Sequence, residues 1–216
     1  TEAAFFNPAG LFQITQQSVN AVYMNYLEGI NCGSVVYAQP FNEKVSAAFF
    51  SRFLSTTETK TLSDEQGNYL GEDGEFGFSN VELGIAGSYH VSNTLNLGAA
   101  LKMLHESIDG NSAAAFALDL GIYHFTQNEN LHIGLALRNL GFQISHFTND
   151  KYTENLPTLV DLGFGFQPVD MLLLSADLYK PFAQDYSLRF GTEIKVHEML
   201  FLRLGYKNEG ADWKTG

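Results

Sequence analysis

Apolar and polar residues alternate along most of the chain from residue 18 onward. In 94–107, for example, Leu97, Leu101 and Met103 fall on one face, while Lys102 and Glu106 fall on the other. A period of two residues is that of an extended strand, because a helix would scatter the same positions around its axis. The pattern predicts eleven strands, over residues 18–27, 30–39, 44–54, 76–89, 94–107, 112–125, 131–142, 160–167, 172–178, 188–196 and 199–207.

The environment of the apolar face of these strands can be interpreted in two ways. In a soluble sandwich it is the core, whereas in a membrane barrel it contacts lipid. The strands exceed the roughly five or six residues usual in globular proteins, and the polar face is rich in glycine. The longest connections, 55–75 and 143–156, fall on one side, although two short links, 28–29 and 109–111, share that side. We therefore predict an all-β fold, a transmembrane up-and-down antiparallel barrel.

Strand parity extends this prediction. Bacterial single-chain barrels have an even number of strands and return to the periplasm. If the chain starts on the periplasmic side, an eleventh strand ends outside. We therefore expect about fourteen strands in the full barrel, with the C-terminal ones missing from this sequence. The expected division is a plug segment over 1–15 and the barrel over 16–216.

Composition changes this picture only slightly. The chain is 45% hydrophobic with a mean hydropathy of −0.08, and no run of about 18 apolar residues could form a membrane helix. The net charge of −12 argues against nucleic acid as a partner, since phosphate binding needs clustered Lys and Arg. Segment 55–75 carries six acidic residues against one lysine, and we read it as a solvated loop rather than a cation or partner site.

Charged residues recur on the polar face of the strands. Both signs occur on neighbouring strands, so we expect cross-strand ion pairs that brace the wall, in preference to a selectivity pore or a catalytic site. The predicted lumen-facing charges are Arg52, Lys102, Glu106, Asp119, Arg138, Asp161, Asp177, Arg189, Glu193, Lys195, Arg203 and Lys207. Acid and base catalysis would need a positioned nucleophile as well, and the sequence places none beside them.

Glycines share this polar face. Their positions are Gly98, Gly121, Gly134, Gly163, Gly165, Gly191 and Gly205. A glycine inside a strand indicates either a bend or the close approach of another backbone. A packed plug and simple barrel curvature account for them equally well.

Motifs for enzymatic chemistry are missing from the sequence. It holds no Gly-x-Ser-x-Gly, no phosphate-binding loop and no His-Glu-x-x-His. None of its six histidines has metal-ligand spacing from a cysteine or carboxylate, and the single Cys32 cannot form an internal disulfide. We therefore predict a protein that is not an enzyme and has no metal or cofactor.

The first fifteen residues break the alternation. Thr1 to Leu11 reads TEAAFFNPAGL, in which Pro8 lacks a backbone donor and restricts Asn7. The segment is thus a poor membrane strand, and Gly10 suits a compact turn.

This segment, followed by barrel strands, resembles the mature N-terminus of FadL-type outer-membrane proteins. Further stretches resemble the PorV/PorQ family of that superfamily: LGAALKMLHESIDGNSAAAFALDLGIYH (97–124), LALRNLG (135–141), LPTLVDLGFGF (156–166) and LRFGTEIKVHEMLFLRLGYK (188–207). The resemblance implies a fourteen-stranded barrel in a bacterial outer membrane. It also implies that Asn7, Pro8 and Ala9, with Gly10, form a hatch inside it.

Two functions follow from the resemblance. PorV-type members act in type IX secretion with a larger translocon barrel and secreted cargo, whereas FadL proper carries hydrophobic small molecules inward. The sequence favours the PorV-type role, because a charged inner face suits an apolar conduit less well. A purely structural outer-membrane protein is a third reading.

Overall fold

The computed structural model describes residues 1–26, 29–126, 130–147 and 155–208. They form one antiparallel sheet in which eleven strands pair in sequence order. Its strands are β1 (Ser18–Asn25), β2 (Asn31–Pro40), β3 (Val45–Ser63), β4 (Tyr69–Ser92), β5 (Leu95–Ile108), β6 (Asn111–Phe125), β7 (Leu131–Ser145), β8 (Leu159–Val169), β9 (Leu172–Pro181), β10 (Ser187–His197) and β11 (Leu200–Asn208). The predicted all-β fold and all eleven strands are confirmed.

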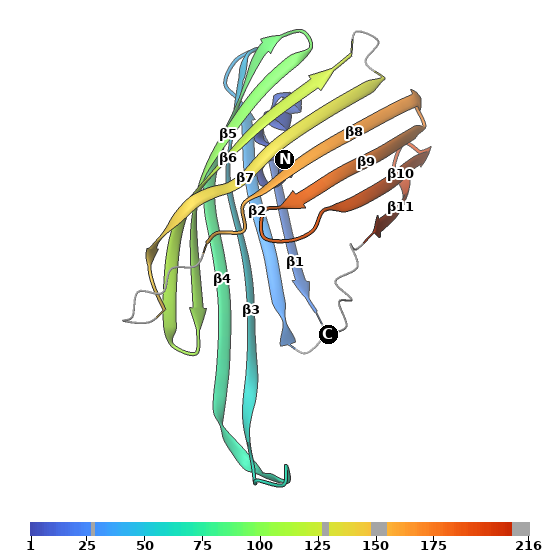
Figure 1. Ribbon diagram of the computed structural model, residues 1–216. Coiled ribbons are helices and arrows are strands. Elements are labelled where there is room, and N and C mark those ends of the chain that lie inside the picture. The colour runs from blue at the N-terminus through green and yellow to red at the C-terminus, as the bar shows by residue number, and fades with distance from the viewer. Residues whose placement is uncertain (27–28, 127–129, 148–154, 209–216) are drawn as a thin grey trace.

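The sheet curls around two short helical segments at the start of the chain, α1 (Ala3–Phe6) and η1 (Pro8–Gln13) (Figure 1). We call the face that they contact the inner face and residues 1–15 the N-terminal segment. Figure 1 places this segment at the opposite end of the sheet from the long β3–β4 hairpin. No helix among the described residues is long and apolar enough to cross a membrane.

The best-buried apolar side chains lie between the N-terminal segment and strands β2 to β5. Leu11, Val36 and Phe50 are each 0% exposed, and small alanines fill the space around them. The predicted apolar face behaves differently: on β5, Ala100 is 2% exposed on the inner face while its neighbour Leu101 is 52% exposed on the outer face. The leucine-rich face is therefore not the core of the described part of the chain.

The prediction of a loop over residues 55–75 is wrong. β3 runs to Ser63 and β4 starts at Tyr69, so only 64–68 turn. Apolar alternation stops here, but four threonines on β3 at 56, 57, 59 and 61 favour extended backbone through their branched Cβ atoms. Pairing with β2 ends at Ser55 and pairing with β5 ends at Phe78, so residues 56–77 form a two-stranded ribbon beyond their neighbours.

The second predicted loop, 143–156, begins later than predicted. β7 continues to Ser145, while the described residues 155–158 are not in a strand. Residues 148–154 lie outside the described part of the chain. The first fifteen residues are also more ordered than a simple turn, since they form α1 and η1.

Candidate functional site

Asn7 attaches the N-terminal segment to the wall. Its Oδ1 accepts a hydrogen bond from the Ala9 amide at 3.1 Å and caps η1, in which Pro8 takes the first position, where its missing donor costs nothing. Its Nδ2 donates to the carbonyl of Ile122 on β6 at 3.0 Å and lies 3.4 Å from that of Leu135 on β7. One side chain thus both starts η1 and joins it to two strands.

Glycines make room for this contact. A methyl group at Gly98 would clash with the backbone of Pro8 and Ala9, and one at Gly121 would clash with Asn7 Oδ1. At Gly134 it would lie 3.3 Å from Asn7 Nδ2. Close approach of the N-terminal segment therefore explains these three positions.

The other glycines of the inner face do not contact the N-terminal segment. Gly163 and Gly191 leave space for Asp177 and Ser175 on β9 instead, and Gly165 and Gly205 have only ordinary neighbours. Close approach of the N-terminal segment thus accounts for three of the seven glycines, and room for side chains of β9 accounts for two more.

Two arginines of the wall cover the aromatic rings of α1. The Arg52 guanidinium on β3 lies 5.6 Å from the ring centroid of Phe5, and that of Arg138 on β7 lies 5.5 Å from Phe6. Phe5 also packs edge-on against Phe50, with centroids 5.0 Å apart. Cations at this distance are attracted to an aromatic face, so two distant strands hold α1.

At the other end of the segment, Phe12 packs against aromatic side chains of β6. Its ring centroid is 5.3 Å from Tyr123 and 5.8 Å from Phe125. The Tyr123 hydroxyl in turn lies 3.0 Å from His132 Nδ1 on β7. Hydrogen bonds and ring contacts therefore join the N-terminal segment to the inner face from Phe5 to Phe12.

The predicted inward charges Arg52, Lys102 and Asp119 take part in two ion pairs, one of them with Glu82, which was not predicted. Arg52 Nη2 is 2.8 Å from Glu82 Oε2, and the Glu82 side chain is 1% exposed. Lys102 Nζ is 2.8 Å from Asp119 Oδ2, with both side chains 1% exposed. The expected cross-strand pairs are present at these two places.

Asn139, in a β-bulge of β7, forms hydrogen bonds to both members of the second ion pair. Asn139 has φ 58°, its amide donates to Asp119 Oδ1 at 2.7 Å, and its Oδ1 accepts from Lys102 at 2.5 Å. Its carbonyl accepts from Thr158 Oγ1 at 2.9 Å, and its Nδ2 donates to Pro157 at 3.1 Å. The β7–β8 ladder ends immediately before it, at Arg138 and Leu159.

The remaining predicted charges are more loosely held. Glu193 pairs with Arg203 at 2.6 Å, but the arginine side chain is 71% exposed. Glu106 accepts from Asn80 at 2.9 Å, and the Arg189 guanidinium lies 3.8 Å from the Tyr179 ring. Lys195 and Lys207 are exposed at the C-terminal edge of the sheet.

Among the described residues, Asp161 and Asp177 have no cation within 4.0 Å, and Arg138 and Arg189 have no carboxylate within that distance. This part of the inner face therefore departs from the expected ladder of ion pairs.

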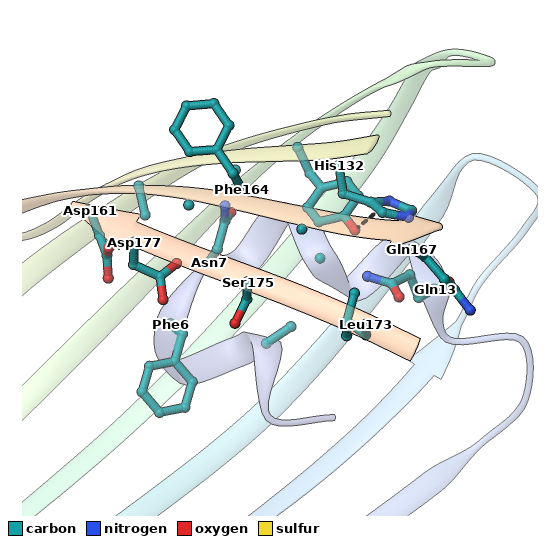
Figure 2. Close-up of a pocket in the computed structure, with 17 residues that line it drawn as sticks. Phe6, Asn7, Gln13, His132, Asp161, Phe164, Gln167, Leu173, Ser175 and Asp177 are labelled. Carbon is teal, nitrogen blue, oxygen red and sulfur yellow. Dashed lines mark hydrogen bonds between the residues drawn. The ribbon is translucent and has the colours of Figure 1, made fainter. Parts of the chain in front are cut away.

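Two hollows open on the inner face. The β6–β9 cavity, of about 500 Å³, lies between the N-terminal segment and strands β6 to β9 (Figure 2). The β1–β4 cavity, of about 570 Å³, lies on the hairpin side of Arg52. Arg52 lines the β1–β4 cavity and also covers Phe5, so this cavity ends at the N-terminal segment.

Sequence reasoning missed several residues of this region. Glu82 stands between Val81 and Leu83 in the predicted strand 76–89, and their alternation would have placed it inward. Asn139 had no such signal, because a bulge breaks the period that locates it. Among the described residues, no group of three or more His, Cys, Asp or Glu is arranged to hold a metal ion.

The chain is similar to known proteins both in sequence and in fold. No family model matches the chain. It is 26% identical over 196 residues to a UPF0164 protein of Treponema pallidum (strain Nichols), a match that covers 82% of this chain and 45% of that protein. The chain thus spans less than half the length of this curated relative.

Solved structures show closer likeness in shape. The toluene transporter TodX of Pseudomonas putida superposes with a TM-score of 0.67 and 13% identity, over 96% of this chain and 78% of TodX. A FadL homologue of Pseudomonas aeruginosa superposes with a TM-score of 0.61 and 12% identity, over 94% of this chain and 74% of that structure. At such identities the likeness establishes the fold: this chain is built as a FadL-type β-barrel wall.

Proposed function

We propose that this protein is an outer-membrane barrel that conducts hydrophobic small molecules. The observation that carries the proposal is the apolar lining of the β1–β4 cavity, which contains Val22, Met24, Cys32, Leu54 and Phe78. Val22, Met24 and Leu54 are 50%, 48% and 39% exposed on the inner face. An apolar inner surface is what a lipophilic ligand needs, since ligand pockets are mostly apolar with few polar groups.

The charges that disfavoured a conduit at the level of sequence do not line this surface, apart from Arg52. Glu82, Lys102 and Asp119 are each 1% exposed, sealed beneath the N-terminal segment or within the wall. On β5 the register puts Leu104 and Ile108 on the same face, with Glu106 between them accepting a hydrogen bond from Asn80 at 2.9 Å. A path for apolar molecules therefore runs from the hairpin end down to Arg52.

The outer face supports a location in the membrane. Large side chains such as Leu101, Phe142 and Phe190 are 52%, 65% and 50% exposed, and they recur on every strand from β3 to β11. Soluble monomers rarely expose apolar patches beyond a few hundred Å². Lipid hydrocarbon is the environment that satisfies such a face, as it does in barrels that alternate apolar and polar positions.

In this proposal the N-terminal segment is a hatch. Asn7 and Pro8 start its helix η1, and Pro8 and Ala9 pass over glycines of the wall, while Gly10 lies against Ala3. Arg52 and Arg138 cover the rings of Phe5 and Phe6. The hatch lies between the two cavities, so movement of residues 1–15 would join them. Among the described residues, the β7–β8 ladder ends at Arg138 beside the hatch, and Asn139 continues the contact only through its bonds to Pro157 and Thr158.

Uptake measurements on vesicles test the proposal. The purified protein in lipid vesicles is expected to admit radiolabelled toluene faster than empty vesicles do. Leu54→Asp puts a charge on the apolar path and is expected to reduce uptake by about tenfold or more, because burying an unpaired charge is costly. Thr57→Asp, on the exposed ribbon beyond the path, is the matched control. Equal uptake by Leu54→Asp and wild type would contradict the proposal.

A second candidate is the PorV-type role, in which the chain binds a larger translocon barrel and secreted cargo. The ribbon over 56–77 favours it, because within the described residues it pairs with no third strand, although Lys60 and Gly77 bond to Asp109. An isolated two-stranded hairpin is only marginally stable in water. Replacing residues 59–75 by a two-residue turn separates the candidates. Loss of a co-purifying barrel with retained toluene uptake would show that partner binding and conduction are separate.

A further inference from the structure

We infer that the β6–β9 cavity binds a small aromatic molecule that carries a protonated amine. The inference deepens the proposed conduit and rests on it for the route by which the ligand arrives. Binding at the cavity is a separate property, which a titration measures without any transport.

The shape of the cavity suits a flat ring. Gly134 and Gly163 are directly paired across β7 and β8, and Gly165 follows on the same face, so the wall has no side chains at these three positions. Phe6 of α1 and Leu173 of β9 also line the cavity. In Figure 2 the Phe164 ring points away from this side of β8, so no bulky side chain of β8 fills the hollow. A volume of about 500 Å³ is ample for one substituted benzene ring.

One end of the cavity is acidic. Figure 2 shows Asp161 of β8, with Asp177 and Ser175 of β9, pointing to the same side of the sheet as Phe6. Neither carboxylate has a cation within 4.0 Å among the described residues, and Asp161 Oδ1 is buried with no hydrogen-bond partner. A carboxylate left in this state is costly, so a cation bound beside it stabilises the site.

Two arginines lie close by but are directed elsewhere. Arg189 is opposite Asp177 in the register of β9 and β10, yet its guanidinium lies over the Tyr179 ring at 3.8 Å. Arg138, which is 7% exposed, covers Phe6 at 5.5 Å. The charges of both arginines reach Asp161, but neither side chain lines the cavity, so the charged groups that a ligand would contact there are the two aspartates.

The opposite end is polar without a carboxylate. Gln13 of η1, Gln167 of β8 and the hydrogen-bonded pair of Tyr123 and His132 line it. A ligand is therefore oriented with its amine toward Asp161 and Asp177 and its ring between the glycines and Phe6. The same charges disfavour a carboxylate ligand of equal size.

Three probes of nearly equal size test this inference. The full chain, purified in detergent, is titrated calorimetrically with benzylamine, toluene and benzoate at pH 7. Benzylamine is expected to bind about tenfold more tightly than toluene, the usual gain of a charge-assisted contact, and benzoate is expected to show no binding. Asp177→Asn and Asp161→Asn are each expected to weaken benzylamine about tenfold and leave toluene unchanged.

Two further variants keep the test decisive. Glu193→Gln removes an inner-face carboxylate outside the cavity and is expected to change nothing. Gly165→Leu fills the hollow at a glycine whose added Cβ has no contact closer than 3.6 Å, and it is expected to abolish the binding of both benzylamine and toluene.

The outcomes separate this inference from the proposed function. Equal affinities for benzylamine and toluene, or aspartate variants that bind benzylamine as wild type does, would overturn the amine site and leave conduction untouched. Benzylamine binding that depends on Asp161 and Asp177, in a protein that fails to conduct toluene into vesicles, would support the site and overturn the conduit.

Discussion

Asn7 of the N-terminal segment lies directly over Gly121 of β6. Its Oδ1 lies 2.1 Å from the point where any other residue at position 121 would put its Cβ, while its Nδ2 donates to the carbonyl of the next residue, Ile122, at 3.0 Å. A polar side chain thus fits against a wall position that has no side chain. The N-terminal segment depends on this fit, and on the similar one over Gly98, for its place on the inner face.

Gly121→Val is therefore expected to displace the N-terminal segment while the barrel stays folded. The clash removes the bond from Asn7 to Ile122 and separates η1 from the wall. Limited proteolysis of the protein in lipid vesicles checks this, with faster cleavage within residues 1–15 as the expected result. Gly87→Val, where an added Cβ meets nothing closer than 3.8 Å, is the matched control. Unchanged cleavage in both variants would contradict the role given to Gly121.

Lys102 and Asp119 form a buried ion pair in which each charge compensates the other. Lys102→Met or Asp119→Leu alone is expected to destabilise the protein by about 3–5 kcal/mol, because each leaves an uncompensated buried charge. The double variant is expected to recover most of that loss. Urea titration in lipid vesicles, followed by the gel mobility of the folded form, measures the free energy of unfolding. Additive losses in the double variant would refute the coupling.

Arg52 and Arg203 both pair with a glutamate, but the two glutamates differ in exposure. Glu82 is 1% exposed in its side chain, whereas Glu193 is 30% exposed. Arg52→Gln is expected to cost about 2–3 kcal/mol, since it leaves a buried carboxylate poorly satisfied. Arg203→Gln is expected to cost about 1 kcal/mol or less, as for other solvent-exposed pairs. Equal losses in the same urea titration would argue against burial as the cause.

The turn at the tip of the β3–β4 hairpin is expected to depend on pH. Hydrogen bonds from the Asn68 side chain and from backbone amides of the turn lower the pKa of Asp64 below its usual value of 3.8. Because the folded-state pKa is depressed, the stabilisation is present above pH 3.8 and is lost as the pH falls through the lower value. Hydrogen exchange of the Gln66 and Asn68 amides measures it.

Asp64→Ala is expected to abolish this pH dependence and to speed exchange of the Gln66 and Asn68 amides above pH 4 or so. Glu65→Gln is the control, since it removes a neighbouring carboxylate while Asp64 still accepts the hydrogen bonds from Gln66 and Asn68. Exchange that accelerates toward low pH in Asp64→Ala as it does in wild type would show that another group is responsible.

Much of the wall was predictable because strand periodicity is a local property. Leu97, Leu101 and Met103 share a face in any strand that contains them, so the sequence alone located all eleven strands and separated the leucine-rich face from the charged one. The same rule failed over 56–63, where threonine replaces apolar alternation, and the ribbon was mistaken for a loop.

The partners of the charged residues were decided only by the tertiary structure. Periodicity placed Lys102, Asp119 and Asp161 on one face, but it did not show that a bulge at Asn139 seals the first two into a buried pair. Nor did it show that Asp161 lies beside a cavity with no cation within 4.0 Å in the part of the chain that the structure describes. Which face a side chain takes follows from its place in its own strand, whereas its neighbours depend on register, bulges and the position of residues 1–15, all of which are set by contacts between distant parts of the chain.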